Sequence, residues 1–230
     1  MKESNQVNRR DFIQKMVMGA AALSAGGILF AGCKKDGKTE VSPVEDLMGE
    51  HGVLERLLLI FDELSNAMAA GGHAPANAFR DAAGILRNFI ENYHEKLEEE
   101  FLFPRFRTRN VRVDLVNVLQ AQHDAGRRVM DGITASARLK GEVPDPRRTA
   151  ERLRAFVRMF RSHMGWEDTV LFPAFRTIVS PSEYHELGER FEDREHEKFG
   201  EHGFADTVER VLAIERELHI HELARFTVAG

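Results

Sequence analysis

Two histidines of this chain each stand four residues before a glutamate, inside one longer pattern that occurs twice. The pattern is HxxxExxxLFPxFR, found as HEKLEEEFLFPRFR from His94 and as HMGWEDTVLFPAFR from His163. A helix turns by about 100° per residue, so His94 and Glu98 come within roughly 40° of each other on one helix face. The same holds for His163 and Glu167. Each copy therefore presents an imidazole and a carboxylate together, which can share a metal ion or a proton.

Two further histidines stand alone in sequences that also read as helices. His51 lies in MGEHGVLERLLLIF and His123 lies in VLQAQHDAGRRVM. The order along the chain is thus a single histidine, an HxxxE pair, a second single histidine and a second HxxxE pair. Inward side chains on the facing helices of a bundle build metal sites. The pattern therefore predicts that four histidines and two glutamates converge in the core.

Capping and helix-breaking residues divide residues 42–176 into four predicted helices. Each helix is expected to end at a glycine or a proline, and these residues are Gly71-Gly72, Pro104, Gly141 and Pro173. Ser42-Pro43-Val44-Glu45 opens the first helix with a capping serine, a proline at the first helical position and a glutamate three residues after the cap. Asp145-Pro146 opens the fourth. We predict an all-α protein whose core is an up-down-up-down four-helix bundle.

Residues 177–230 are expected to add extra C-terminal helices that brace the open side of the bundle. Ser180-Pro181 repeats the capping signature, and residues 208–218 carry apolar residues at helical spacing. His196 and His202 lie in the segment EHEKFGEHGF, which could approach the site or form a second one. A polar surface turn is the preferred interpretation.

One such histidine would be weak evidence for a site. A single core histidine is most often satisfied by a backbone carbonyl, and a single HxxxE is most often a surface ion pair worth about 0.2–0.5 kcal/mol. Four core histidines in register with two glutamates are different, because burying carboxylates without compensating charge is costly. A bound metal ion removes that penalty, so we expect metal binding.

This combination resembles the hemerythrin-like (HHE cation-binding) proteins, whose pattern is H, HxxxE, H, HxxxE, often with LFP after each HxxxE. The resemblance covers residues 42–176. It implies a centre in which four histidines bind two non-haem iron ions and two glutamates bridge them: His51, His94, His123, His163, Glu98 and Glu167. Imidazole and carboxylate also suit manganese, and no ligand soft enough to favour copper is available.

Two departures from the oxygen-carrying members of that family bear on function. Those proteins add a fifth histidine four residues after the third-helix histidine, where this chain has Arg127. Arg127 is expected to point to solvent, or else to line the mouth of the site. They also place an aspartate five residues after the last histidine, so Asp168 competes with Glu167 as a ligand. Glu167 is preferred, because five positions swing a side chain roughly 140° from the histidine on a regular helix, and Asp168 is expected to be solvated.

The missing fifth imidazole implies open positions for exogenous ligands. The resemblance then implies a diiron protein that reacts with nitric oxide, peroxide or dioxygen in stress defence or iron-centre repair, as a diiron oxidoreductase with an unknown electron donor. The alternative is an oxygen- or iron-binding, storage or sensing module without turnover. A third reading is a structural lipoprotein in which the metal only staples the bundle. Tyr93 and Trp166 are interpreted as packing residues, with electron relay as the alternative.

Residues 1–33 predict an export signal. Arg9-Arg10-Asp11-Phe12-Ile13 resembles a twin-arginine signal, and the uncharged run 17–32 is shorter than the roughly 20 residues that a spanning helix needs. Phe30-Ala31-Gly32-Cys33 resembles a lipobox, with phenylalanine where leucine is usual. Cys33 is the only cysteine, cannot form an internal disulfide, and is the predicted lipidation site. Residues 34–41 are read as a linker.

The composition fits a single domain with appendages. A chain of 230 residues with 43% hydrophobic and 30% charged residues can bury one core of ordinary size. The net charge is −5 and no basic patch is present, which argues against a nucleic-acid partner. The expected partners are a small diatomic or peroxide ligand, and a membrane through the lipid on Cys33. The expected location is the periplasmic side of a bacterial membrane.

Overall fold

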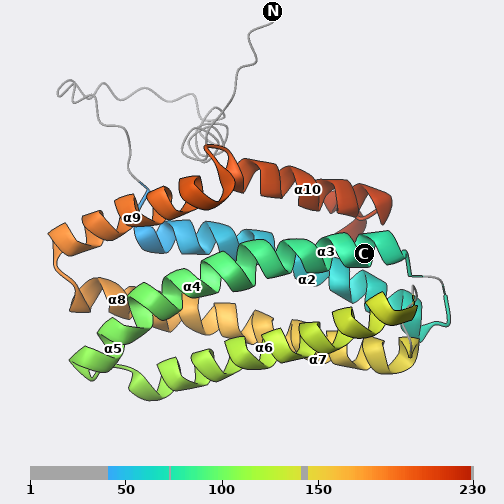
Figure 1. The fold of residues 1–230 in the computed structure, drawn as a ribbon, viewed down its shortest axis with the longest axis horizontal. Coiled ribbons are helices and arrows are strands. Elements are labelled where there is room, and N and C mark those ends of the chain that lie inside the picture. The colour runs from blue at the N-terminus through green and yellow to red at the C-terminus, as the bar shows by residue number, and fades with distance from the viewer. Residues whose placement is uncertain (1–40, 73, 141–144, 229–230) are drawn as a thin grey trace, which may run out of the picture.

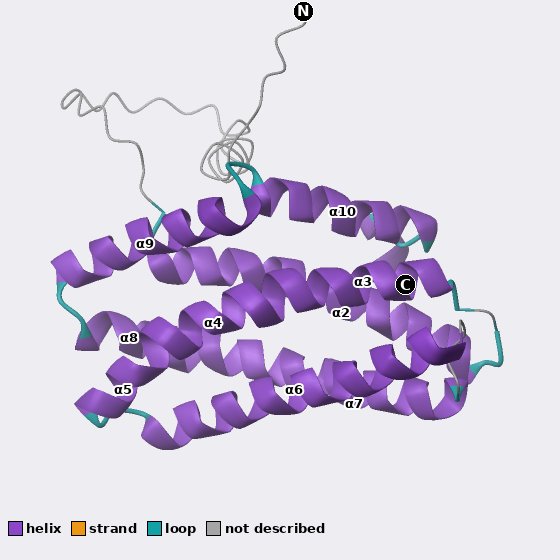
Figure 2. Ribbon diagram, viewed as in Figure 1, coloured by secondary structure: helices purple, strands orange, loops and turns teal. Residues whose placement is uncertain are grey.

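A computed structural model describes residues 41–72, 74–140 and 145–228, with the side chains of these ranges except those of 136–140. Within these ranges every regular element is a helix (Figure 2), so the all-α class is confirmed. The predicted signal at 1–33, with Cys33, and the linker up to residue 40 lie outside the described residues. None of the described helices combines the length and apolar character that crossing a membrane requires.

Four helical rods lie alongside one another and form the body of the protein (Figure 1). The first rod is α2 (Pro43–Ala69), and the third is α6 (Val113–Lys140). The second joins α3 (Ala76–Ile85), η1 (Leu86–His94), α4 (Glu95–Leu97), η2 (Glu98–Leu102) and α5 (Phe103–Arg109). The fourth joins α7 (Pro146–Trp166), η3 (Glu167–Leu171) and α8 (Phe172–Ile178). The most extensive contact between rods is that of α2 with α7.

The predicted helix starts are confirmed by their hydrogen bonds. The backbone N–H of Glu45 donates to Ser42 Oγ (3.4 Å), and the N–H of Ser42 donates to Glu45 Oε2 (3.0 Å). At the start of α7 the N–H of Arg148 donates to Asp145 Oδ1 (3.1 Å). These side chains satisfy N–H groups that the first turn of a helix leaves without a partner.

The predicted helix ends at Pro104 and Pro173 are wrong, because the helix continues past each proline in α5 and α8. Each proline follows a π-helical segment, η2 or η3, and stands in the first turn of the next α-helical segment. A proline inside a regular α-helix clashes with the carbonyl one turn earlier. The wider π turn changes the backbone pairing at that point, which lets the rod continue. Asn110, in the left-handed region at φ 53°, ends the second rod instead.

Two further helices cover one side of the rods, as expected for the C-terminal residues (Figure 1). They are α9 (Pro181–Phe199) and α10 (Gly203–Glu217), followed by a short 3-10 turn, η4 (Leu223–Phe226). Both helices pack on α2, and α10 also packs on α3. Phe191 of α9 is fully buried, and Arg56 of α2 donates to both carboxylate oxygens of Glu215 in α10 (2.8 and 2.6 Å).

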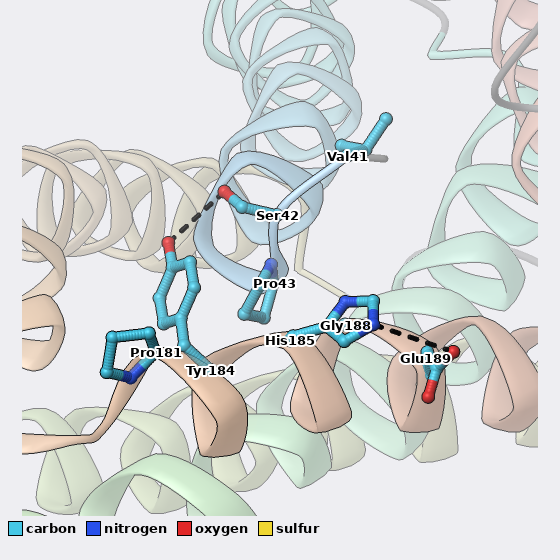
Figure 3. Close-up of a pocket in the computed structure, with 8 residues that line it drawn as sticks. All are labelled: Val41, Ser42, Pro43, Pro181, Tyr184, His185, Gly188 and Glu189. Atoms are coloured by element: carbon cyan, nitrogen blue, oxygen red, sulfur yellow. Dashed lines mark hydrogen bonds and ion pairs between the residues drawn. The ribbon is translucent and has the colours of Figure 1, made fainter. Parts of the chain in front are cut away.

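A small pocket of about 150 Å³ lies where α9 crosses the start of α2 (Figure 3). Tyr184 points across it, and its hydroxyl donates to Ser42 Oγ (3.1 Å). His185 also lines the pocket and lies 3.9 Å from Glu189 on the same helix. The pocket therefore belongs to the seam between α9 and α2, and none of the predicted metal ligands lines it.

The third and fourth rods approach closely at the buried Gly126 of α6. A Cβ at this position would lie 2.6 and 2.8 Å from Cε2 and Cζ of Phe160 in α7. The ring of Phe160 cannot easily move away, because it is buried and contacts the rings of Phe156 and His163. A residue without a side chain is therefore required here.

We expect Gly126→Ala to lower the free energy of unfolding by about 1–3 kcal/mol, since it overpacks the contact with Phe160. Gly165→Ala, in α7, is the matched control, because its added Cβ would meet no atom within 4 Å apart from its chain neighbours and the adjacent backbone of its own helix. That change should stabilise the protein by roughly 0.5–1 kcal/mol through the better helix propensity of alanine. Denaturant unfolding of both variants tests this, and equal effects would contradict the packing argument.

Candidate metal centre

The structure brings the six predicted ligands together in the core of the four rods. Their exposures lie between 0% and 4%: His51, His94, Glu98, His123, His163 and Glu167. Ligand atoms of Glu98, His123, His163 and Glu167 lie within 4.8 Å of one another, and so do those of His51, His94 and Glu98. Glu98 belongs to both groups. Two candidate cation positions therefore lie next to each other.

Three of these side chains sit at the borders of the π-helical segments. His94 is the last residue of η1, Glu98 is the first residue of η2, and Glu167 is the first residue of η3. Such turns recur at functional sites because they change which side chains share a helix face. The two copies of the pattern thus share a backbone conformation as well as their residue types.

Glu167 lies between an imidazole of each group. Its Oε2 is 3.3 Å from His51 Nε2, and its Oε1 is 3.0 Å from His163 Nε2. Burial would raise the pKa of this carboxyl, but the electrostatic attraction of the adjacent His163 and His51 holds it well below its usual range. Glu167 therefore has the placement of a bridging carboxylate.

Glu98 takes the equivalent place on the other side. Its Oε2 lies 3.9 Å from His94 Nε2 and 3.4 Å from His123 Nε2. Burial, with the negative charge of Glu167 next in importance, raises the pKa of Glu98 well above its ordinary value. Without a cation, a second negative charge in this centre is strongly unfavourable.

Each imidazole uses its Nδ1 to donate to an acceptor at the edge of the centre. His51 Nδ1 donates to Asp168 Oδ1, and His94 Nδ1 donates to Glu50 Oε2, both over 2.7 Å. These four residues are called the His51 half below. Since Nδ1 donates in both bonds, each Nε2 is directed inward, where it offers a lone pair to a cation when the ring is neutral.

The second pair of imidazoles is held in the same way. His123 Nδ1 donates to Glu99 Oε1 over 3.1 Å, and His163 Nδ1 donates to Gln122 Oε1 over 2.9 Å. These four residues are called the His123 half. None of Glu50, Glu99 and Gln122 was identified from the sequence, although each stands directly beside a predicted ligand.

The geometry of the His123 half requires a positive charge. The Nε2 atoms of His123 and His163 lie 3.0 Å apart, and their lone pairs face each other when both rings donate from Nδ1. All four carboxylate oxygens of Glu98 and Glu167, and His51 Nε2, lack a hydrogen-bond partner. Buried donors and acceptors of this kind are costly unless they are paired. The set of nitrogen and oxygen ligands fits a divalent ion such as iron or manganese.

The pKa values of three of the histidines shift in different directions. Burial alone would lower the pKa of His51, but the hydrogen bonds and charges of Asp168 and Glu167 outweigh it and raise the pKa to about 9. Burial dominates at His94, whose pKa is lowered, and at His123, whose pKa falls to about 4. In the absence of a cation, a proton on His51 therefore supplies positive charge beside Glu167.

The LFP segments place an aromatic ring on each single histidine. Phe103 stacks on His123 with ring centroids 5.6 Å apart and planes at 20°. Phe172 stacks on His51 with centroids 5.5 Å apart and planes at 18°. Each copy of the pattern thus covers a histidine that lies outside it, which orients that ring and keeps water from the centre. The Leu-Phe-Pro sequence shared by both copies was the feature of the sequence that could have indicated this stacking.

Two expectations about neighbouring residues are wrong. Asp168 is not simply solvated, because its side chain is only 30% exposed and accepts the hydrogen bond from His51. Glu167 is the carboxylate that faces both groups, and its assignment as the ligand stays a prediction. Trp166 was expected to pack but is 53% exposed. Tyr93 does pack, among phenylalanine rings.

Arg127 does not point to solvent either. Its guanidinium donates to Glu95 and to Glu99 Oε1, the second over 2.6 Å, and its side chain is 19% exposed. Glu95, Glu99 and His123 form a third group with the spacing to hold a cation. Arg127 supplies positive charge to that group. The polar surface turn expected for the segment with His196 and His202 is confirmed only in part: residues 200–202 connect α9 to α10, but His196 lies in the last turn of α9, and Glu195 and Phe204 are buried.

A family model of the hemerythrin HHE cation binding domain matches residues 42–175 of this chain. The chain belongs to the hemerythrin family. It is also similar to the uncharacterized proteins Rv1995 of Mycobacterium tuberculosis and Mb2018 of Mycobacterium bovis. Each is 42% identical over 189 residues, which cover 81% of this chain and 74% of the relative. No solved structure gives a significant match. Membership of the hemerythrin family makes these buried histidine and glutamate groups a candidate cation-binding centre.

In a hemerythrin-type centre, Glu98→Gln should stabilise the cation-free protein and weaken cation binding. The substitution removes a buried carboxyl whose ionisation is opposed by burial and by Glu167. Thermal unfolding near pH 7 should therefore show a higher Tm without metal and a smaller rise in Tm on adding iron(II) or manganese(II). Glu100→Gln is the control, since that side chain is 46% exposed, and it should change neither value much. A lower Tm of the metal-free variant would contradict the argument.

Proposed function

We propose that this protein is a non-haem diiron protein that reacts with nitric oxide, peroxide or dioxygen. The observation that carries the proposal is the pair of adjacent ligand groups, each with two imidazoles, on either side of Glu98 and Glu167. Iron bound there would supply electron transfer and positions for small ligands. Manganese is the second metal that suits the same residues.

The proposal includes an up-down-up-down order of the four rods. Residues 70–75 link α2 to α3, and residues 110–112 link α5 to α6. Short connections of this kind favour antiparallel neighbours. In that arrangement the ligands that the four rods contribute meet in one layer.

The surrounding residues support reaction with an exogenous molecule. Arg127 stands where oxygen-carrying relatives have a fifth histidine, and a guanidinium has no lone pair to offer a metal. The protein then supplies four imidazoles, and coordination positions are left for a small ligand. Phe103 and Phe172 shield the imidazoles on which they stack from water.

A module that binds oxygen or iron without turnover is the second candidate. Its support is the burial of the centre, where every predicted ligand is at most 4% exposed. Exclusion of water and of large reductants slows side reactions.

We expect about two irons per chain after anaerobic reconstitution, because two bridging carboxylates with four imidazoles suit a metal pair. His94→Ala and His163→Ala should each lose at least one iron. His185→Ala, on α9 with a side chain 51% exposed, should lose none. Metal analysis measures all three, and one iron in the unmodified protein would contradict the diiron assignment.

On adding oxygen, peroxide or nitric oxide, optical spectra should show irreversible oxidation. Oxygen binding that survives repeated degassing would favour the binding module.

Export and lipid anchoring complete the proposal, and they rest on the sequence of residues 1–33. Replacing Arg9 and Arg10 with lysine should leave the protein in the cytoplasm with its metal bound, because the twin-arginine route carries folded proteins. Cys33→Ser removes the predicted site of lipid attachment. The mature chain should therefore be released from membranes, because membrane binding depends on the attached acyl chains. Fractionation and immunoblotting measure both. Membrane association that survives Cys33→Ser would point to a retained anchor at 17–32.

A further inference from the structure

The two halves of the centre are related by the sequence repeat, residue by residue. The single histidines His51 and His123 correspond, and so do His94 and His163 in the two HxxxE pairs. The residue after each bridging glutamate binds the single histidine, as Asp168 binds His51 and Glu99 binds His123. The residue before each single histidine binds the histidine of an HxxxE pair, as Glu50 binds His94 and Gln122 binds His163.

One pair of corresponding residues differs in charge. Glu50 offers His94 a carboxylate at 2.7 Å, whereas Gln122 offers His163 a neutral amide oxygen at 2.9 Å. A carboxylate that accepts from Nδ1 raises the basicity of the imidazole as a ligand, and changing such a partner typically alters metal affinity by about 10–100-fold. His163 is therefore the weaker donor of the two.

The other acceptor of the His123 half is shared. Glu99 Oε1 accepts from His123 at 3.1 Å, from Gln120 at 2.8 Å and from Arg127 at 2.6 Å. Lys96 binds the other oxygen of Glu99. These cations withdraw negative charge from the bond to His123, which is longer than the 2.7 Å bond between His51 and Asp168. Both acceptors of the His123 half thus polarise their imidazoles less than those of the His51 half.

We infer that the two cation positions are unequal, and that the one in the His123 half is bound more weakly and accepts the small exogenous anion or diatomic molecule. The inference rests on the proposed two-metal function. Weaker donation from the imidazoles leaves a metal ion more Lewis acidic, so it gains more from an added ligand. The guanidinium of Arg127, on the carboxylate that holds His123, adds positive charge on the same side.

Titration of the metal-free protein with cobalt(II), followed by visible absorption, tests the difference between the halves. The unmodified protein should bind in two steps. Gln122→Glu should tighten the weaker step by about tenfold, and Glu50→Gln should loosen the tighter step by about tenfold. Asn66→Asp makes the same change of charge at an exposed position of α2 and should alter neither step.

Azide then identifies the half that takes the exogenous ligand. It should change the cobalt spectrum little at one equivalent of metal and strongly once the second, weaker position is filled. Azide binding at one equivalent, or Gln122→Glu acting on the tighter step or on neither step, would overturn the inference. Two equal steps that azide does not distinguish would overturn it as well while leaving the two-metal centre intact. Binding of a single cobalt by the unmodified protein would instead contradict the proposed function itself.

Discussion

The structure depends on one constraint: two carboxylates, Glu98 and Glu167, face the same small space in a dry core. Neither is exposed to solvent, and none of their oxygens has a hydrogen-bond partner. Such charge is tolerated only with compensating positive charge. The hydrophobic packing of the four rods brings the glutamates together, and the four imidazoles make their meeting place suitable for cations. Cation binding at this candidate centre is therefore expected to be coupled to the stability of the folded state.

The same constraint explains the regular pattern of the residues that accept hydrogen bonds from the four imidazoles. A ligating imidazole must keep its proton on Nδ1, so each ring needs an acceptor at its outer edge. Two of these acceptors, Glu99 and Asp168, directly follow Glu98 and Glu167 in the two copies of the pattern, and Glu50 and Gln122 directly precede the two single histidines. Gln122 is the exception in charge, and Arg127 adds a cation near the same half. The repeat therefore builds a nearly symmetric centre, and single residues make its halves chemically different.

The sequence predicted the parts of the fold that depend on local signals. Capping boxes such as Ser42 with Glu45 need only neighbours along the chain, and helical spacing placed His94 and Glu98 on one face. The role of Asp168 was missed, because it depends on His51 on another rod. Pro104 was read as a helix end, since the π turn that accommodates it has no established signature in a single sequence. A single sequence therefore predicts features that depend on neighbouring residues, but it does not predict contacts between residues on different rods.

Anomalous diffraction from crystals of the iron-loaded protein, measured on either side of the iron absorption edge, tests the central claim most directly. The account predicts two neighbouring peaks in the core, one beside His51 and His94 and the other beside His123 and His163, with Glu98 and Glu167 between them. A single peak, or a peak beside Glu95 and Glu99 with none between the glutamates, would contradict it.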